Sequence, residues 1–127
     1  MRRTVDELLA EARAGLDRLT PQQAWERMQT GAVLVDTRPE HQRRASGEVP
    51  GAVVIDRNVL EWRLDPASDA RLPEASYDAH VVLLCQQGYS SSFAAQMLQR
   101  IGITRATDVV GGFEQWVAEG LPTRTPS

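Results

Sequence analysis

The sequence predicts an α/β protein in which a parallel sheet of four to five strands is covered by helices on both faces. Short apolar runs alternate along the chain with helix-like patterns, an order typical of parallel sheets. The apolar runs are rich in β-branched residues and hold no internal polar residue, as expected of strands buried on both faces. A length of 127 residues fits one domain around one core.

The chain begins with two helical patterns. Apolar residues recur at helical spacing from Val5 to Leu16, so residues 1–17 are predicted to form an N-terminal helical extension. We expect it to pack on the main body or on a partner. A second helix begins at Thr20, the cap, with Pro21 at its first position and Gln23 completing a capping box.

Four strands are predicted, and the fourth is shorter than the others: residues 32–36, 52–55, 81–84 and 109–110. Apolar stripes predict two further helices, one over residues 93–101 and one over 113–117, each closed by a glycine. Residues 64–80 contain two prolines and are expected to form a surface loop. Residues 123–127 are expected to form a frayed tail.

Composition narrows the classes of function. The net charge of −3 argues against nucleic-acid binding. No apolar run approaches the roughly 18 residues that span a bilayer, and no apolar signal segment follows Met1, so a soluble cytoplasmic protein without a membrane partner is expected. The single cysteine excludes an internal disulfide and a cysteine-built metal cluster. All fourteen basic residues are arginines, which excludes lysine chemistry and is compatible with a GC-rich bacterial genome.

The only cysteine, Cys85, lies between the third strand and a predicted helix. Helix N-termini carry unpaired N–H groups and a dipole that favour a thiolate. Glycine in the loop permits a backbone conformation that a side chain forbids, and the serines donate hydrogen bonds to anions. The pattern predicts a cradle for anionic sulfur or an oxyanion, made of Gln86, Gln87, Gly88, Tyr89, Ser90 and Ser91. The alternative is a buried structural cysteine followed by a polar turn.

Neither histidine is expected to act as the base for Cys85. His80 lies five residues upstream on the same strand, which places it ~16 Å away at the opposite end. His41 is expected in a solvated loop. Asp36 ends the first strand at the same sheet edge as Cys85, where parallel sheets bind their ligands. Activation of the thiol is therefore assigned to backbone amides.

Four stretches of the sequence resemble one family. Residues 33–40 are similar to its strand ending in Asp-x-Arg, and residues 47–52 to its Gly-His-Ile-Pro-Gly-Ala element. Residues 82–91 match its apolar strand, Cys-x-x-Gly loop and serine-led helix, and residues 111–122 match Gly-Gly-x-x-x-Trp followed by Gly-Leu-Pro. The chain is identified as a member of the single-domain rhodanese-like sulfurtransferase family. The resemblance implies a three-layer fold over residues 18–122.

The resemblance also implies a mechanism. Cys85 would attack the outer sulfur of a small anionic donor such as thiosulfate and carry that sulfur as a persulfide. A thiol or cyanide acceptor would then remove it. The loop amides would stabilise the anionic sulfur, and no metal or organic cofactor is implied.

Several positions depart from the family pattern. Ser90 stands where many single-domain members have arginine, so an anionic donor needs another cation. Arg57 and Arg63 follow the second strand and are candidates for that role. Arg38 is a third candidate, although we expect it to hold loops together with Asp36.

Two further positions bear on rival functions. The phosphatase relatives of this fold need an arginine six positions after the cysteine, where this chain has Ser91. Glu48 replaces the histidine of the Gly-His element and is expected on the surface. The main alternative to an enzyme is a catalytically weak binding or regulatory module. In that reading the N-terminal helix contributes a partner or self-association surface.

Overall fold

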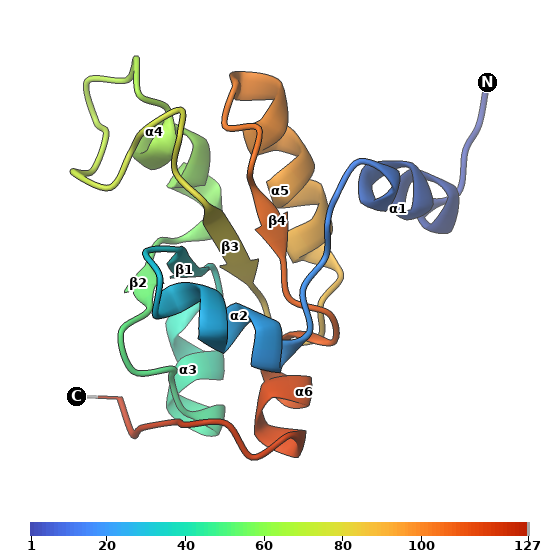
Figure 1. The fold of residues 1–127 in the computed structure, drawn as a ribbon. Coiled ribbons are helices and arrows are strands. Elements are labelled where there is room, and N and C mark those ends of the chain that lie inside the picture. Colours follow the sequence, from blue (N-terminus) through green and yellow to red (C-terminus); the bar gives the residue numbers. More distant parts are fainter. Residues whose placement is uncertain (127) are drawn as a thin grey trace.

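A computed structural model, described over residues 1–126, contains a four-stranded parallel sheet between two layers of helices (Figure 1). The strands are β1 (Val33–Asp36), β2 (Val53–Val54), β3 (Val81–Leu84) and β4 (Thr107–Asp108), in the order β2-β1-β3-β4. Every neighbouring pair is parallel. The predicted fold class is therefore confirmed. Within residues 1–126, no helix combines the length and apolarity needed to cross a membrane.

Six α-helices connect and cover these strands within the described residues. They are α1 (Val5–Ala14), α2 (Pro21–Met28), α3 (Glu40–Ser46), α4 (Leu60–Leu64), α5 (Ser90–Ile101) and α6 (Gly112–Ala118), with a 3-10 turn over Arg57–Val59. The predicted capping box of α2 is present, since Thr20 accepts from the Gln23 amide and Gln23 accepts from the Thr20 amide.

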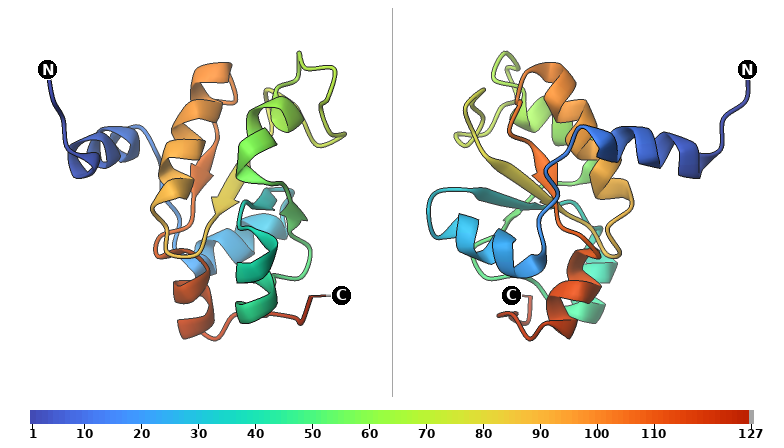
Figure 2. Two further views of the ribbon diagram at one scale, coloured as in Figure 1. Left: turned by 180° about the vertical axis from the view of Figure 1, so that it is seen from behind. Right: turned by 45° about the vertical axis from the view of Figure 1, so that its right-hand side comes forward.

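The central strand β3 builds both halves of the core by simple alternation. Val81 and Leu83 pack toward α4 and α5, whereas Val82 and Leu84 pack toward α2 and α6. Figure 2 shows α4 and α5 on one side of the sheet and α2 on the other. Each fully buried leucine stabilises the fold by about 1.5–3 kcal/mol. The alternation continues past the strand, so Cys85 returns to the α5 side of the sheet.

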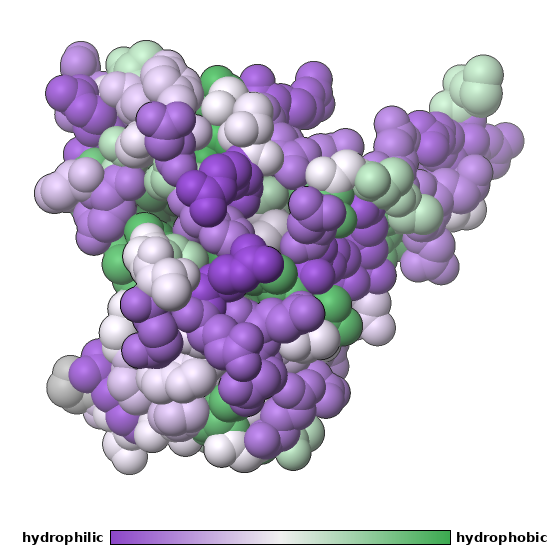
Figure 3. Space-filling view, in the orientation of Figure 1, coloured by the Kyte–Doolittle hydropathy of each residue, from purple (hydrophilic) through white to green (hydrophobic). Residues whose placement is uncertain are grey.

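The N-terminal extension packs on the main body. Leu9 and Ala12 of α1 are buried, and α1 lies against α5. Its N-terminal end projects from the body (Figures 1, 2 and 3). Leu16, just beyond α1, joins the core cluster on the α5 side of the sheet. The expectation of packing on the body is confirmed, and a partner surface on this helix stays a prediction.

The prediction of a strand over Val109–Val110 is wrong. The fourth strand is Thr107–Asp108, and Val109 forms only an isolated bridge with Leu19. Both residues of β4 are polar but buried. A search for apolar runs therefore passes over the strand and selects the valines beside it.

His41 was expected in a loop, and that expectation is also wrong. It lies on α3, in which no residue is buried. A helix without a buried face shows no apolar stripe, so the sequence pattern gives no sign of it. The expected loop over residues 64–80 is confirmed from residue 65 onward, and Leu64 instead ends α4 with its side chain buried.

Glu48 is buried and not on the surface as expected. Its carboxylate accepts a hydrogen bond from Arg43 at 2.7 Å, and its backbone exchanges two hydrogen bonds with Arg124 at 2.8 and 2.9 Å. That pairing holds Arg124 within the expected tail, and fraying of residues 125–126 stays a prediction. Ser127 lies outside the described residues.

Candidate functional site

Cys85 lies directly after β3, at the carboxyl edge of the sheet. The residue is only 6% exposed and its thiol is free. Its Sγ atom accepts a hydrogen bond from the Gly88 amide at 3.1 Å and lies 3.2 Å from the Ser91 hydroxyl. Helix α5 begins at Ser90, so the sulfur faces the loop and the first turn of that helix.

Three carbonyl groups of the loop, those of Cys85, Gln86 and Gly88, are held from outside the loop. The Cys85 and Gln86 carbonyls accept from the first amides of α6, those of Phe113 and Glu114, at 2.8 and 3.1 Å. The Gly88 carbonyl accepts from two guanidinium groups, which lie on α1 and on the linker after it: Arg13 at 2.7 Å and Arg18 at 3.1 Å.

These bonds fix where the loop amides point. In a trans peptide the N–H points opposite to the C=O, and the described chain has no cis peptide. The amides of Gln86, Gln87 and Tyr89 therefore point away from α6 and the two arginines. None of the three has an acceptor within residues 1–126. They lie in the same loop as the Gly88 amide, which donates to the sulfur.

Asp108 is the fixed centre behind this loop. Its buried carboxylate accepts from the Ser91 and Ser92 hydroxyls at 2.7 and 2.8 Å and pairs with the Arg18 guanidinium at 2.8 Å. Because the single hydroxyl proton of Ser91 goes to Asp108, the Ser91 oxygen is left to accept from the Cys85 thiol. A hydrogen-bonded chain therefore runs from the sulfur to a buried ion pair.

Two glycines allow the loop to approach α6. Gly88 and Gly112 have φ values of +86° and +63°, which side chains rarely adopt. A Cβ on Gly88 would lie 2.7 Å from the Gly111 amide, and a Cβ on Gly112 would lie 2.5 Å from the Cys85 carbonyl oxygen. Glycine at both positions 88 and 112 is thus required for the hydrogen bond between α6 and the Cys85 carbonyl.

A cavity of about 360 Å³ opens in front of Cys85. Arg38 and Arg57 line it, together with loop residues Gln86, Gln87, Tyr89 and Ser90. Arg38 is fully buried, and its guanidinium binds the Asp36 carboxylate, the Gly47 carbonyl and the Gln86 side chain. The guanidinium also lies 4.0 Å above the Phe113 ring. Arg38 and Asp36 thus hold the neighbouring loops against one another.

Arg57 and Arg63 are in different positions relative to this cavity. Arg57 lines it and uses one nitrogen, Nη1, for the Glu61 carboxylate at 2.9 and 3.0 Å. Arg63 does not line it and donates to the Ala70 carbonyl at 2.6 Å. Of these two candidate cations, Arg57 alone lines the cavity in front of Cys85.

Sequence reasoning missed three residues of the site: Arg13, Arg18 and Asp108. The two arginines come from the extension and its linker, where no motif marks them. Asp108 ends β4, next to the strand that leads to Cys85, so it occupies the position that singled out Asp36 on β1. Correct placement of β4 would have found it.

The chain is similar to a known family and to curated relatives. The family model described as "Rhodanese-like domain" matches residues 20–119. A thiosulfate sulfurtransferase GlpE from Haemophilus influenzae is 35% identical over 108 residues, covering 84% of this chain and 93% of the relative. The GlpE from Glaesserella parasuis is 40% identical over 105 residues, covering 82% and 89%.

Solved structures resemble the whole chain, including α1. A Rhodopseudomonas palustris protein, described as of unknown function and a possible tyrosine phosphatase, has a TM-score of 0.89 at 28% identity, covering 98% of this chain and 96% of its own. A polysulfide-sulfur transferase homodimer from Wolinella succinogenes has a TM-score of 0.77 at 24% identity, covering 95% and 87%. At 24% identity, the similarity to the Wolinella succinogenes protein is evidence of a shared fold only.

The close approach of α6 can be tested with Gly112→Ala. Besides the φ strain of about 1–2 kcal/mol, the new Cβ must push the Cys85 carbonyl away. We expect a large fall in melting temperature and a changed rate of Cys85 alkylation. Gly120→Ala is the matched control, because Gly120 has φ +74° with open space around its Cβ position. Equal effects of the two substitutions would contradict the steric argument.

Proposed function

This chain belongs to the rhodanese-like domain family, and from that membership we propose that it is a sulfurtransferase. It moves a sulfane sulfur from a donor of the thiosulfate class to a nucleophilic acceptor through a persulfide on Cys85. The observation that carries the proposal is the set of loop amides beside the buried sulfur, three of which have no acceptor within residues 1–126. The two relatives at 35 and 40% identity are thiosulfate sulfurtransferases, which supports the same activity.

In the first half-reaction the Cys85 thiolate attacks the outer sulfur of thiosulfate. A new S–S bond forms, the bond to the sulfonate sulfur breaks, and sulfite leaves with that electron pair. The sulfonate oxygens face Arg57 across the cavity, where its remaining N–H groups are directed at neither oxygen of Glu61. The products are sulfite and a Cys85 persulfide.

The persulfide carries one negative charge, and the loop provides hydrogen-bond donors that stabilise this charge. The amides of Gln86, Gln87 and Tyr89 supply neutral donors that need no rearrangement. Ser91 can turn its proton from Asp108 to the sulfur, because Asp108 keeps Arg18 and Ser92 as partners. An acceptor thiolate or cyanide then attacks the outer sulfur, and the electron pair of the broken S–S bond returns Cys85 to the thiolate.

Two rival functions are less well supported. A binding module needs no unpaired amides around a buried sulfur, although the exposed Val5 and Leu8 of α1 leave a partner surface open to test. A phosphatase needs an arginine where Ser91 donates to Asp108. The lone thiol suits a reducing compartment, so a cytoplasmic bacterial enzyme is the setting we propose.

The central test is the intact mass of the protein after brief thiosulfate treatment. We expect one added sulfur on the natural chain, removed by cyanide with formation of thiocyanate. Cys85→Ser is the control and should gain no mass. Absence of added sulfur from both thiosulfate and mercaptopyruvate would reject the sulfurtransferase and favour the binding module.

Arg57→Gln should weaken thiosulfate binding, because it removes the charge that faces the donor. We expect KM for thiosulfate to rise by roughly tenfold, as expected for loss of a charge-assisted hydrogen bond. Melting temperature should change little, since the Arg57–Glu61 pair is partly exposed. Arg63→Gln is the matched control on the same segment, and an equal rise in KM there would remove Arg57 from the donor site.

Arg13 is proposed as a positioning residue that fixes the Gly88–Tyr89 peptide from α1. Arg13→Gln should lower kcat for persulfide formation by roughly tenfold, because the Gly88–Tyr89 peptide loses the shorter of the two guanidinium bonds that fix the direction of the Tyr89 amide. Steady-state kinetics with thiosulfate measures this. Arg3→Gln is the control, since Arg3 pairs only with Glu11 on the exposed face of the same segment. A parallel loss of melting temperature and activity would make Arg13 a structural residue alone.

A further inference from the structure

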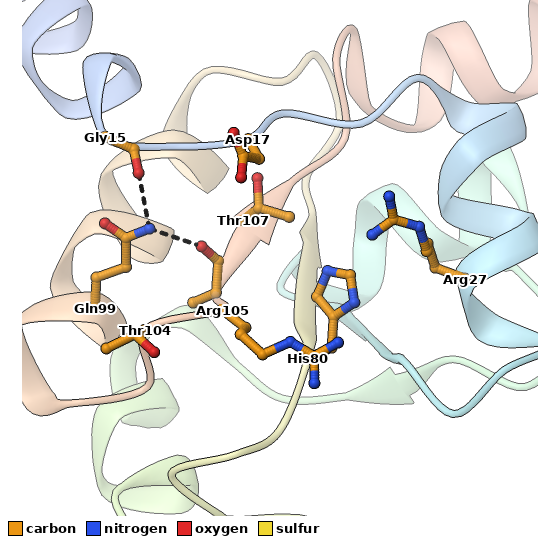
Figure 4. A pocket seen from close by; sticks show the side chains of 9 residues that line it. Gly15, Asp17, Arg27, His80, Gln99, Thr104, Arg105 and Thr107 are labelled. Carbon is orange, nitrogen blue, oxygen red and sulfur yellow. Dashed lines mark hydrogen bonds between the residues drawn. The ribbon is translucent and has the colours of Figure 1, made fainter.

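A second cavity lies at the amino end of the strands, opposite the Cys85 edge. Its volume is about 280 Å³. Figure 4 shows it from close by, with Arg27 reaching in from α2, Arg105 from the turn before β4, and His80 between them. His80 immediately precedes β3, so it is separated from Cys85 by the length of that strand.

The two arginines of this cavity form no ion pair with a carboxylate within residues 1–126. Within residues 1–126, neither Arg27 nor Arg105 has a carboxylate within 4 Å. Among the described residues, Arg105 makes a single side-chain hydrogen bond, a long one of 3.3 Å to the Asp78 carbonyl. The two charges remain close enough to act on His80: burial first, then Arg105 and Arg27, hold the pKa of His80 below its ordinary value.

The facing wall has the opposite character. Asp17, from the linker between α1 and α2, lines this side beside Thr107 (Figure 4). Thr107 is 3% exposed, and its hydroxyl has no hydrogen-bond partner within residues 1–126. Gln99 is already used, since its amide donates to the Gly15 and Ala106 carbonyls at 3.0 Å. The cavity thus offers cations on one side and an acceptor on the other.

We infer that this cavity binds a small tetrahedral oxyanion that still carries a proton, of the hydrogenphosphate type, either free or as a monoester. Its charged oxygens accept hydrogen bonds from Arg27, Arg105 and protonated His80. Its P–OH group donates a hydrogen bond to Asp17. The site is independent of sulfur transfer, because it shares no lining residue with the cavity in front of Cys85.

The charges that face His80 determine how anion binding in this cavity depends on pH. Arg27 and Arg105 oppose its protonation, and Asp17 is the only carboxylate among the residues that line the cavity. A bound anion offsets the two arginines and favours the imidazolium, so binding strengthens as pH falls through the pKa of His80. The bound anion should raise that pKa, because an opposite charge nearby favours the imidazolium.

The test is an NMR titration of the two histidine imidazoles at about pH 6.5, where inorganic phosphate keeps at least one proton. Sodium chloride at equal ionic strength is the blank, because screening alone weakens the effect of the arginines on His80. We expect a saturable shift of His80 with phosphate, and none of His41, which is exposed on α3. A non-saturable drift, or the same drift in chloride, would reject the site.

Variants assign the ligand to these side chains. Arg27→Gln and Arg105→Gln should each weaken phosphate binding by roughly tenfold, whereas Arg44→Gln, an exposed arginine on α3, should not. Melting temperatures should stay close to that of the natural chain. Unchanged phosphate affinity in both cavity variants would overturn the proposal.

Sulfate and ethyl phosphate test the chemistry of the ligand. Sulfate carries no proton at this pH, so it should bind more weakly than phosphate, and Asp17→Asn should remove that preference. Sulfate binding as tight as that of phosphate in the natural chain would overturn the assigned chemistry. Ethyl phosphate binding at least as tightly as phosphate assigns the site to monoesters, and weaker binding assigns it to the free ion.

Discussion

The hydrogen bond from the Phe113 amide to the Cys85 carbonyl is the constraint around which this site is arranged. It turns the first peptide of the loop so that its N–H points toward the sulfur side, and the bond from Glu114 to Gln86 does the same for the second. Neither bond can form unless α6 touches the loop, and only glycine at position 112 leaves the space for that contact. The buried Phe113 and Trp116 side chains then keep α6 on the sheet.

The buried ion pair of Asp108 and Arg18 stabilises the other half of the loop. A charge at 0% exposure is costly unless it is fully hydrogen-bonded, and Asp108 meets that condition with two hydroxyls and a guanidinium. Arg18 also binds the Gly88 carbonyl, so one ion pair connects the linker after α1, the end of β4 and the persulfide loop. Removing Arg18 would leave the buried Asp108 carboxylate without its counter-charge, so this network contributes to stability as well as to the arrangement of the loop.

Sequence patterns predicted those parts of the fold and site that are governed by local rules. The apolar strands β1 and β3, the capped helix α2 and the position of Cys85 at a strand end follow from burial and capping. The exposed helix α3 and the polar strand β4 do not, because their residues lack the apolar signature of a core element. Arg13 belongs to neither group: it meets Gly88 across 75 positions of sequence, and no spacing rule predicts a contact of that range.

Ser90 in place of the family's loop arginine also has a physical rationale. A guanidinium beside the sulfur would lower the basicity of the thiolate, and the nucleophilicity of a thiolate falls with its basicity. Neutral amides and the Ser91 hydroxyl hold the negative sulfur without a full charge, so the persulfide remains able to give up its outer sulfur. In the proposed reaction, the charge needed for an anionic donor comes from Arg57, which lines the cavity and would meet the departing sulfonate group and not the sulfur that stays. Because the cation and the neutral amides act on different parts of the donor, the same cavity can bind an anion and still release the sulfur that Cys85 has accepted.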